Sequence, residues 1–549
     1  MPVVVGAGRG GAVEQSRPHQ VAEPVDAGGG EAEGLEPVVA LPLRRAGSFI
    51  ILEHMYESRT LGRRPPSAIY AGRVSDTSHY DLVIIGTGSG NSLVTPELQG
   101  RRIAIVEGGV FGGTCLNVGC IPTKMFVYAA EVATTIRDAA RFGIDATLDQ
   151  VRWADIRDRV FGRIDPISDG GRDYRVTGEH TEAYLGHARF VGDHELEVEI
   201  THDGGEHALG SVHRISGEQI VIATGASPVV PEVIRASGVP FETSDTVMRL
   251  EELPARLVVL GGGVIAAEFA HIFSALGVAV TIVNRSDGLL RVLDREIAVA
   301  YTDLARAQWD VRTGVEAVDA RQDEAGIELR LSDGSVVTGD TLLVATGRAP
   351  NTDDLGLERT AVRTHDDGRV VVDRFGRTDV TGVWSLGDAS SEHQLKHVAN
   401  HEARVVAHNL AHPDELRPFD HRFVPAAIFS HPQVATVGLS EEEAREQGYD
   451  VTTKVQRYGD TAYGWAMEDT TGILKAVGDA ATGRLLGVHC LGAHASTLVQ
   501  PAIQALSLGP DVTAHELARG QYWIHPALSE VLENALLGLT VPGDVGDAT

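Results

Sequence analysis

Cysteine is scarce in this chain of 549 residues, which contains only three. So few cysteines cannot form a disulfide framework of the kind that stabilises small secreted domains. Basic residues are also in short supply, because 47 Lys and Arg stand against 76 Asp and Glu, a formal charge of −29. A chain this acidic repels the phosphate backbone of nucleic acids. The sequence therefore disfavours nucleic-acid binding as the main function.

Long uninterrupted hydrophobic runs are lacking as well. The longest, 257–283, is broken by a glycine cluster and carries Glu268 and His271, so it is expected to be a strand and a helix and not a membrane span. The N-terminus has no charged stretch leading into an apolar one, as a secretory signal would have. We therefore expect a cytoplasmic protein that does not bind membranes.

Aromatic residues make up only 5% of the chain, whereas glycine occurs 62 times, which is typical of α/β proteins with many tight strand-to-helix turns. The length predicts three to four domains, at roughly 150 residues each. Residues 1–78 are rich in Gly, Pro, Arg and Glu and show no periodicity, so we expect a disordered extension there. Residues 541–549 are expected to be a loose tail.

The order strand, glycine turn, helix and strand occurs twice, about 175 residues apart. The strands are predicted at 81–85 and 102–106 in the first unit and at 257–260 and 278–283 in the second. Repetition at this distance indicates two dinucleotide-binding folds and excludes a short-period solenoid.

The first glycine turn departs from the usual fingerprint, because Asn91 occupies the third glycine position. Gly86 and Gly88 would make the tight turn and let the backbone approach a pyrophosphate at the N-terminus of a helix expected over 91–100. Glu107 lies at the end of the next strand, where a carboxylate would bind ribose hydroxyls. The pattern predicts nucleotide binding; a purely structural glycine turn is the alternative.

The second turn follows the fingerprint with Gly261, Gly263 and Ala266. Where an acidic ribose ligand would indicate NAD, the chain has Asn284 and Arg285, and Arg291 follows six residues later. Guanidinium groups suit the 2′-phosphate of NADPH, which they can bind with two hydrogen bonds. A solvated basic turn is the alternative.

Two of the three cysteines, Cys115 and Cys120, are five residues apart at an expected helix start. Such a pair can close a disulfide, and a helix N-terminus stabilises a thiolate once the pair is reduced. Structural zinc would need four ligands, and the third cysteine, Cys490, lies in an apolar strand and is expected to be an inert core thiol. Two free buried thiols are the alternative.

The C-terminal part changes character from about Phe423. Segments 472–477 and 485–489 alternate between apolar and polar residues and predict an antiparallel sheet, with helices at 498–506 and 530–537.

Two other patterns, one of histidines and one of acidic residues, are interpreted without a functional site. His393, His397 and His401 are spaced by four and would share a helical face, but no set of carboxylates or cysteines accompanies them, so no metal site is expected. The acidic run 441–443 is expected to be a solvated helix start.

Several of these motifs together resemble the class I pyridine nucleotide–disulfide oxidoreductases, which include glutathione reductase and dihydrolipoyl dehydrogenase. The resemblance covers about 79–540 and is carried by the C-x4-C motif, both glycine turns, the Ala-Thr-Gly turn and segments 346–352, 386–388 and 525–526. Within the family it is closest to the branch that reduces mycothione, the disulfide of mycothiol. The segments that match this branch are 86–92, 124–131, 160–166, 463–469 and 520–526.

The resemblance implies an α/β fold with two Rossmann-like domains, binding FAD and NADPH, and a C-terminal α+β dimerisation domain. The implied ranges are 79–229 and 353–421 for the two parts of the FAD domain, 230–352 for the NADPH domain and 422–540 for the dimerisation domain. It also implies a homodimer with shared active sites and a small-molecule disulfide substrate.

Residue roles follow from the same resemblance. Cys115 would be the exposed interchange thiol and Cys120 would face the flavin. Lys124 would lie beside the flavin and pair with Glu268, and His525, oriented by Glu530, would be the acid/base that reaches the thiols from the second subunit. Asp388 would bind the ribityl chain. The complete cofactor-binding set would be Gly86, Gly88, Gly90, Glu107, Gly113, Thr114, Lys124, Thr224, Gly225, Gly261, Gly263, Ala266, Arg285, Arg291, Gly347, Arg348 and Asp388.

The substrate is the least determined expectation. Glutathione reductases hold a substrate carboxylate with an arginine in the helix after the first turn, and 91–100 contains none, which fits a sugar-linked thiol. Dihydrolipoyl dehydrogenase is the alternative enzyme, although it would have an acidic residue near Asn284. Mercuric or thioredoxin reduction would require a second cysteine pair near the C-terminus, and 536–549 has none. A flavoprotein that only binds FAD, as a scaffold, is the alternative outside enzymes.

Overall fold

The computed structural model describes residues 77–98, 100–509 and 511–541. The expected disordered extension lies outside the described residues up to 76, and so do residues 542–549 of the expected tail. The first strand, β1, begins at Ser78, the last residue of the expected extension, so the folded part starts one residue earlier than predicted. Within the described ranges, no helix is long and apolar enough to cross a membrane.

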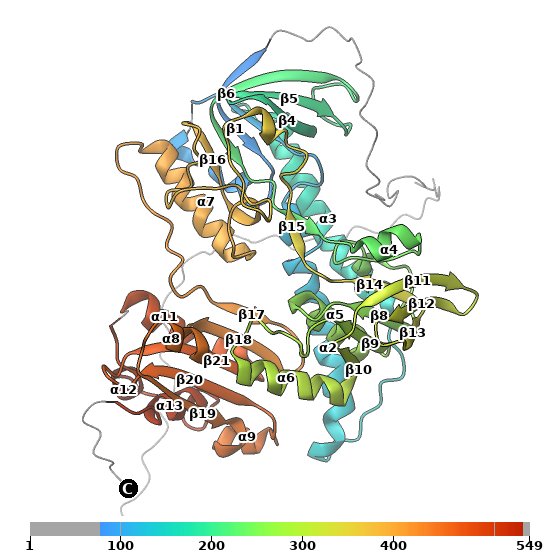
Figure 1. The fold of residues 1–549 in the computed structure, drawn as a ribbon, viewed down its shortest axis with the longest axis vertical. Helices are drawn as coiled ribbons and strands as arrows, with labels where there is room; N and C mark the ends of the chain where they lie inside the picture. Colours follow the sequence, from blue (N-terminus) through green and yellow to red (C-terminus); the bar gives the residue numbers. More distant parts are fainter. Residues whose placement is uncertain (1–76, 99, 510, 542–549) are drawn as a thin grey trace, which may run out of the picture. The chain divides into compact units, whose positions relative to one another are not determined.

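A seven-stranded sheet carries the first glycine turn (Figure 1). Its order is β3-β2-β1-β6-β5-β4, with β16 also paired to β6. The strands are β1 (Ser78–Ile85), β2 (Ile103–Val106), β3 (Thr181–Tyr184), β4 (Gly186–Gly192), β5 (Glu195–Ile200), β6 (Val212–Ile222) and β16 (Val383–Ser385). Alternate residues of β1 face two cores: Leu82 and Ile84 pack with helix α7 (Lys396–Ala411), whereas Val83 and Ile85 pack with the β4–β5 side.

The helix expected over 91–100 is absent, and this prediction was wrong. Two short 3-10 turns, η1 (Gly90–Leu93) and η2 (Pro96–Leu98), take its place among the described residues of that segment. Pro96 has no N–H to donate and disfavours helical backbone at Thr95, so it weakens an α-helix at this point. The turns close through i to i+3 hydrogen bonds, such as Leu98 N to Thr95 O at 3.1 Å.

The second unit matches its prediction. A parallel sheet of order β10-β9-β8-β14 carries the second glycine turn, and α5 follows that turn directly. The elements are β8 (Arg256–Leu260), α5 (Val264–Ala275), β9 (Ala279–Asn284), α6 (Arg295–Gln308), β10 (Asp310–Thr313) and β14 (Thr341–Val344). Helix α4 (Glu232–Ser237) and an antiparallel sheet of β11 (Ala317–Asp323), β12 (Gly326–Leu331) and β13 (Val336–Gly339) accompany them.

Two further strands join separate parts of the chain. β7 (Ala226–Pro228) pairs antiparallel with β15 (Arg348–Pro350), so the Thr224–Gly225 turn lies beside Asn351 and Gly347 lies beside Val229, at the other end of the pair. The sheets thus occupy the parts of the chain in which they were expected. The domain boundaries at 229/230, 352/353 and 421/422 stay a prediction.

The C-terminal sheet is antiparallel, as predicted, with order β17-β18-β21-β20-β19. Its strands are β17 (Ala426–Ile428), β18 (Gln433–Gly438), β19 (Val451–Arg457), β20 (Ile473–Asp479) and β21 (Leu485–Gly492). All residues of β20 and β21 are buried, so both faces of these strands are covered. The helices of this part are α8 (Glu441–Glu446), α9 (Ala462–Ala466), α10 (Ala495–Leu498), α11 (Gln500–Leu508), α12 (Ala514–Arg519) and α13 (Ser529–Leu537).

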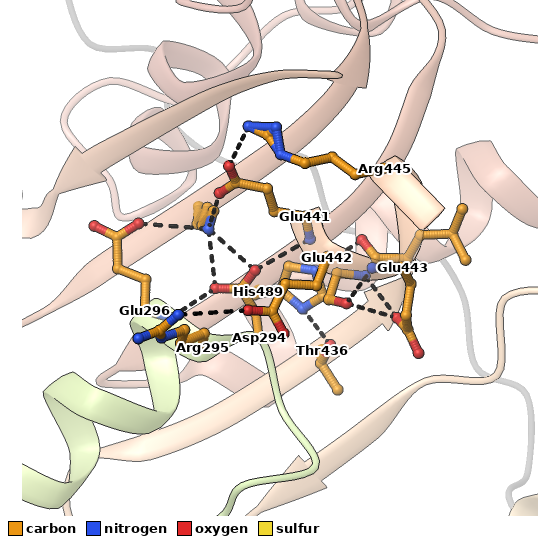
Figure 2. Close-up of polar contacts among 12 residues, drawn as sticks. Asp294, Arg295, Glu296, Thr436, Glu441, Glu442, Glu443, Arg445 and His489 are labelled. Atoms are coloured by element: carbon orange, nitrogen blue, oxygen red, sulfur yellow. Dashed lines mark hydrogen bonds and ion pairs between the residues drawn. The ribbon is translucent and has the colours of Figure 1, made fainter. Parts of the chain in front are cut away.

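A buried ion cluster ties this sheet to α6 (Figure 2). Lys475 of β20, 3% exposed, lies 3.1 Å from Asp294 at the N-cap of α6 and 2.7 Å from Glu441 of α8. Burial opposes charge on Lys475, but hydrogen bonds to Glu441 and Asp294 raise its pKa. The expectation of a fully solvated acidic run was therefore wrong for Glu441, because a β-strand 34 positions further along supplies its cation.

Candidate active site

The two cysteines lie on consecutive short elements. Cys115 is inside α1 (Gly113–Asn117), and Cys120 is the first residue of α2 (Cys120–Asp138). Gly113 has φ +66°, and a Cβ there would meet the Cα of Gly88 at 2.7 Å. The absence of a side chain thus lets the cysteine segment pack directly on the first glycine turn.

Both thiols are free, and a hydrogen bond links them. This hydrogen bond lowers the pKa of Cys120 to about 7, with help from the Lys124 ammonium and against burial. The same hydrogen bond, together with burial, raises the pKa of Cys115 well above its usual range. In the reduced pair the thiolate is therefore on Cys120 and the proton on Cys115.

In the chain alone Cys120 is exposed and Cys115 is half-buried. Cys115 lies within α1 against Gly119, whose Cβ would meet the Cα of Cys115 at 3.3 Å, whereas Cys120 is the first residue of α2. The assignment of Cys115 as interchange thiol and of Cys120 as the thiol that faces the flavin stays a prediction. The alternative of two buried thiols is wrong. Cys490 is fully buried and contacts Tyr458 Oη at 3.1 Å, as expected of a core thiol.

Lys124 stands one helical turn after Cys120 and contacts Glu268 of α5. Its Nζ lies 2.7 Å from both carboxylate oxygens, and Glu268 also accepts the backbone N–H of Phe429 at 2.9 Å. The Glu268 side chain is 7% exposed and the Lys124 side chain 35%, so the carboxylate is shielded from water whereas the ammonium is partly open to it. α2, α5 and the segment before β18 are thus joined beside the thiol pair.

The first glycine turn forms a narrow cradle. Gly86 has φ +103°, and a Cβ there would meet Ala223 O at 2.3 Å. Glu107 Oε2 accepts hydrogen bonds from Thr87 N at 2.8 Å and Thr87 Oγ1 at 2.6 Å, which fixes the carboxylate at the strand end where a ribose would bind. The missing side chain of Gly86 lets the turn pack closely on the backbone that follows β6, and this close turn with a fixed carboxylate at the next strand end fits the dinucleotide FAD.

Asp388 lies in the 3-10 turn η6 (Gly387–Ala389), directly after β16. Burial raises its pKa, against the opposing charges of Arg348 and Lys396. Sequence reasoning missed Glu402 of α7, which is 1% exposed and accepts the Gly387 N–H at 2.6 Å. The turn that holds Asp388 is therefore pinned by a carboxylate 15 positions later, a contact that has no local sequence signal.

The turns expected to complete the FAD site are fixed by backbone contacts. Thr224 Oγ1 donates to Asn351 O at 2.8 Å, and Asn351 N donates to Gly225 O at 2.9 Å. Arg348 donates to Ala226 O and forms an ion pair with Asp245 at 3.5 Å. These contacts give Arg348 a structural part in the β7–β15 connection.

The second glycine turn fits a phosphorylated dinucleotide. Gly261 has φ +133°, and a Cβ there would meet Ala345 O at 2.2 Å. Asn284 Nδ2 donates to Ser286 O at 3.2 Å and Gly288 O at 2.9 Å, so it shapes the loop that carries Arg285. Arg285 and Arg291 are exposed, and neither forms an ion pair with the described residues. Two guanidinium groups thus stand open where an NAD enzyme would have a carboxylate.

His525 and Glu530 form a hydrogen-bonded pair at the other end of the chain. His525 Nδ1 lies 2.6 Å from Glu530 Oε1, and Glu530 Oε2 accepts Ala527 N–H at 3.1 Å. The pair lowers the pKa of Glu530, and the His525 side chain is 71% exposed. Within the described residues of one chain, His525 makes no hydrogen bond to either active-site cysteine.

The three histidines spaced by four do not share a helical face. His393 precedes α7, which begins at Lys396, because the chain is still extended at Leu395. His397 Nε2 contacts Pro425 O at 2.8 Å, and His401 Nε2 accepts the Asp420 N–H at 3.1 Å. No group of three or more His, Cys, Asp or Glu among the described residues is arranged to hold a metal ion.

Comparison with known proteins places these features in a family. Residues 80–403 match the family described as pyridine nucleotide-disulphide oxidoreductase, and residues 424–536 match its dimerisation domain. The chain belongs to the pyridine nucleotide-disulphide oxidoreductases. Its FAD- and NAD(P)H-dependent chemistry and its class, disulfide reduction, follow from this membership, and an FAD-binding scaffold is not favoured.

Relatives of this oxidoreductase cover most of its length. Mycothione reductase of Mycobacterium tuberculosis (strain ATCC 25618 / H37Rv) is 55% identical over 466 residues, 84% of this chain and 99% of the relative. Dihydrolipoyl dehydrogenase of Thermus scotoductus is 35% identical over 473 residues, 83% of this chain and 96% of the relative. Among solved structures, the Cu(II) complex of the HOCl-induced flavoprotein disulfide reductase RclA from Escherichia coli has a TM-score of 0.73 and 28% identity, covering 84% of this chain and 99% of that chain.

Proposed function

We propose that this oxidoreductase uses NADPH to reduce mycothione to two molecules of mycothiol. The 55% identity to mycothione reductase over nearly the whole relative carries the proposal. Two features of the chain support it: the described residues between Gly90 and Leu98 contain no arginine to hold a substrate carboxylate, and Arg285 and Arg291 suit a 2′-phosphate.

FAD, which the first glycine turn and Glu107 would hold, would supply the two-electron chemistry between NADPH and the Cys115–Cys120 disulfide. Residues of the chain stabilise the Cys120 thiolate that forms when this disulfide is reduced. Lys124 lowers the pKa of the Cys120 thiol, and Glu268, whose two oxygens both contact Lys124 Nζ, fixes the ammonium in place. The proton of the reduced pair stays on Cys115.

Cys115 must lose that proton before it can attack, since the thiolate is the nucleophile. We assign this step to His525 of the partner subunit, because the imidazole is exposed and its Nδ1 is occupied by Glu530, which leaves Nε2 free to accept a proton. The Cys115 thiolate then attacks one mycothione sulfur, and the imidazolium protonates the departing mycothiol. The Cys120 thiolate attacks Cys115 Sγ, closes the disulfide and releases the second mycothiolate, which takes a proton from solvent.

A substrate panel tests this proposal. Mycothione, glutathione disulfide and lipoamide are each offered at equal concentration with NADPH and with NADH, and oxidation of the nicotinamide is followed at 340 nm. We expect the highest kcat/KM with mycothione and NADPH. A higher kcat/KM for lipoamide with NADH would assign the protein to dihydrolipoyl dehydrogenases and overturn the proposal.

A further inference from the structure

Two cations from distant parts of the chain contact the first glycine turn. Arg175, in the last turn of α3 (Trp153–Val176), donates Nε to Asn91 Oδ1 at 2.8 Å and Nη2 to Asn91 O at 3.1 Å. Lys396, the first residue of α7, donates Nζ to Ser89 Oγ at 2.9 Å. Asn91 and Ser89 both belong to the turn that approaches the diphosphate of a dinucleotide. Positive charge is thus gathered on this turn by elements that are 221 positions apart.

Neither cation has a carboxylate partner. The chain has 76 acidic and 47 basic residues, yet within its described residues Arg175 and Lys396 form no ion pair with Asp or Glu. Arg175 is only 8% exposed, and burial lowers the pKa of its guanidinium. A buried charge is costly unless an opposite charge compensates it. Among the described residues no carboxylate lies within ion-pair distance of either cation, and Asp388, on which the charge of Lys396 acts, is itself buried with a raised pKa.

The placement of Lys396 also goes against the preference of its own helix. α7 has 16 residues and no acidic residue in its first turn, and a lysine stands at its first position. The N-terminus of a helix favours negative charge, so a lysine there destabilises α7 unless another group benefits. Departures of this kind from local preference are expected at functional sites.

The usual source of positive potential at a dinucleotide turn is weak here. The segment after the turn forms 3-10 turns of four and three residues in place of a full α-helix. Such short turns align few peptide dipoles, so they attract an anion less than a helix N-terminus does. Side-chain cations stand where a helix dipole would otherwise act.

We propose that Lys396 and Arg175 compensate the negative charge of the FAD diphosphate. Lys396 is a binding residue, since its flexible stem lets the ammonium turn from Ser89 to a phosphate oxygen. Arg175 is a positioning residue: it holds Asn91 and supplies positive charge behind the turn. The inference rests on the FAD chemistry of the proposed function and not on which disulfide is reduced.

The experiment measures FAD binding to protein stripped of its cofactor, with no substrate present. Dissociation constants for FAD are obtained from flavin fluorescence at salt concentrations from about 50 to about 500 mM. Over this range the screening of charges by salt increases strongly. ADP and adenosine, which differ in the diphosphate, are measured as competitors. The variants are Lys396→Met, Arg175→Gln and Arg175→Lys. Matched controls are Arg404→Gln, an exposed cation of α7, and Arg172→Gln, a cation of α3 that pairs with Asp173 at 3.0 Å.

We expect Lys396→Met and Arg175→Gln each to weaken FAD binding by about 10- to 100-fold and to flatten its salt dependence. The preference for ADP over adenosine shrinks in both, whereas adenosine binding is unchanged. Arg175→Lys keeps the charge and therefore retains the salt dependence. The two control variants bind FAD like the unsubstituted protein.

Two results overturn the inference. One is an FAD affinity and a salt dependence that are unchanged in Lys396→Met. Lys396 is half-buried, so this substitution leaves the core intact. The Lys396→Met result therefore tests the inference even if Arg175→Gln fails to fold. The other is an equal loss of ADP and adenosine binding, which would assign both residues to the support of the fold. Because the binding assay contains no disulfide, its failure leaves the mycothione proposal standing, and failure of the substrate panel leaves this inference standing.

Discussion

At the residue scale, the charge on Cys120 decides what the reduced pair can do. With a pKa of about 7, set by the Cys115 hydrogen bond and the Lys124 ammonium, the thiol is deprotonated over the upper part of the physiological range. We predict that alkylation of the reduced, cofactor-free protein by iodoacetamide rises with pH around a midpoint near 7. Cys115→Ala and Lys124→Met both move that midpoint upward, because each removes a group that stabilises the thiolate.

Arg404→Gln serves as the control for this titration, since it removes an exposed cation of α7 and should leave the midpoint in place. Cys490 does not interfere, because it is fully buried and burial raises the pKa of its thiol to about 12. A midpoint that stays the same in both Cys115→Ala and Lys124→Met would contradict this account of the thiolate.

The coenzyme preference is also a matter of single residues. Arg285 and Arg291 should each make a charge-assisted contact to the 2′-phosphate, worth about 1.5–3 kcal/mol. Replacing both with glutamine is expected to raise KM for NADPH strongly and to leave KM for NADH nearly unchanged. Arg295→Gln, which removes an exposed cation at the start of α6, is the control. An equal loss for both coenzymes would indicate that the two arginines support the loop and not the phosphate.

At the scale of elements, the sheets could be predicted from the sequence and the first turn could not. Strand-length apolar runs ending in glycine gave the parallel strands, and β20 and β21 pair as expected. Pro96 was a local signal against a helix after the first turn. The prediction gave more weight to the glycine fingerprint, which a helix usually follows. The contacts of Asn91 with Arg175 and of Gly387 with Glu402 had none, because they join elements that only the folded chain brings together.

The ion cluster between α6 and the C-terminal sheet gives a stability prediction at this scale (Figure 2). Lys475→Met would leave Asp294 and Glu441 without their shared cation, and breaking such a buried pair costs about 3–5 kcal/mol. We expect a large fall in the melting temperature of Lys475→Met. The double variant Lys475→Met, Asp294→Asn should lose less free energy of unfolding than the sum of the losses in the two single variants. Strictly additive losses would show that Lys475 and Asp294 do not act as a unit.

The same cluster has a defined dependence on pH. Burial disfavours the charged form of Asp294, but His489 and Lys475 together outweigh burial and lower the pKa of Asp294 in the folded protein. The unfolded chain therefore binds a proton at Asp294 at a higher pH than the folded chain does. The stabilisation by Asp294 is fully present above the ordinary carboxyl pKa and is lost as the pH falls through the lowered one. Asp294→Asn should flatten the acid limb of a plot of melting temperature against pH.

At the scale of the whole molecule, we expect one active site to need two subunits. The thiols lie in the part of the chain that matches the redox family, and His525 lies in the part that matches the dimerisation domain. Cys115→Ser and His525→Ala are each expected to be inactive alone. After subunit exchange, a mixed dimer contains one site with both residues intact, so activity should return. Continued inactivity in a mixture shown to contain mixed dimers would place the acid and the thiols in the same chain.

The central claim is that electrons from NADPH reach mycothione through Cys115 and Cys120. The most direct test is a single turnover without oxygen. The oxidised protein is given one equivalent of NADPH per subunit, small molecules are removed by gel filtration, and the accessible protein thiols are counted with a chromogenic disulfide. A matched sample is given one equivalent of mycothione before the filtration, and its mycothiol is counted in the small-molecule fraction. We predict two new thiols per subunit after NADPH, and in the matched sample their disappearance with release of two mycothiol molecules per subunit. NADPH oxidation without new thiols, or new thiols that persist in the presence of mycothione, would contradict the account.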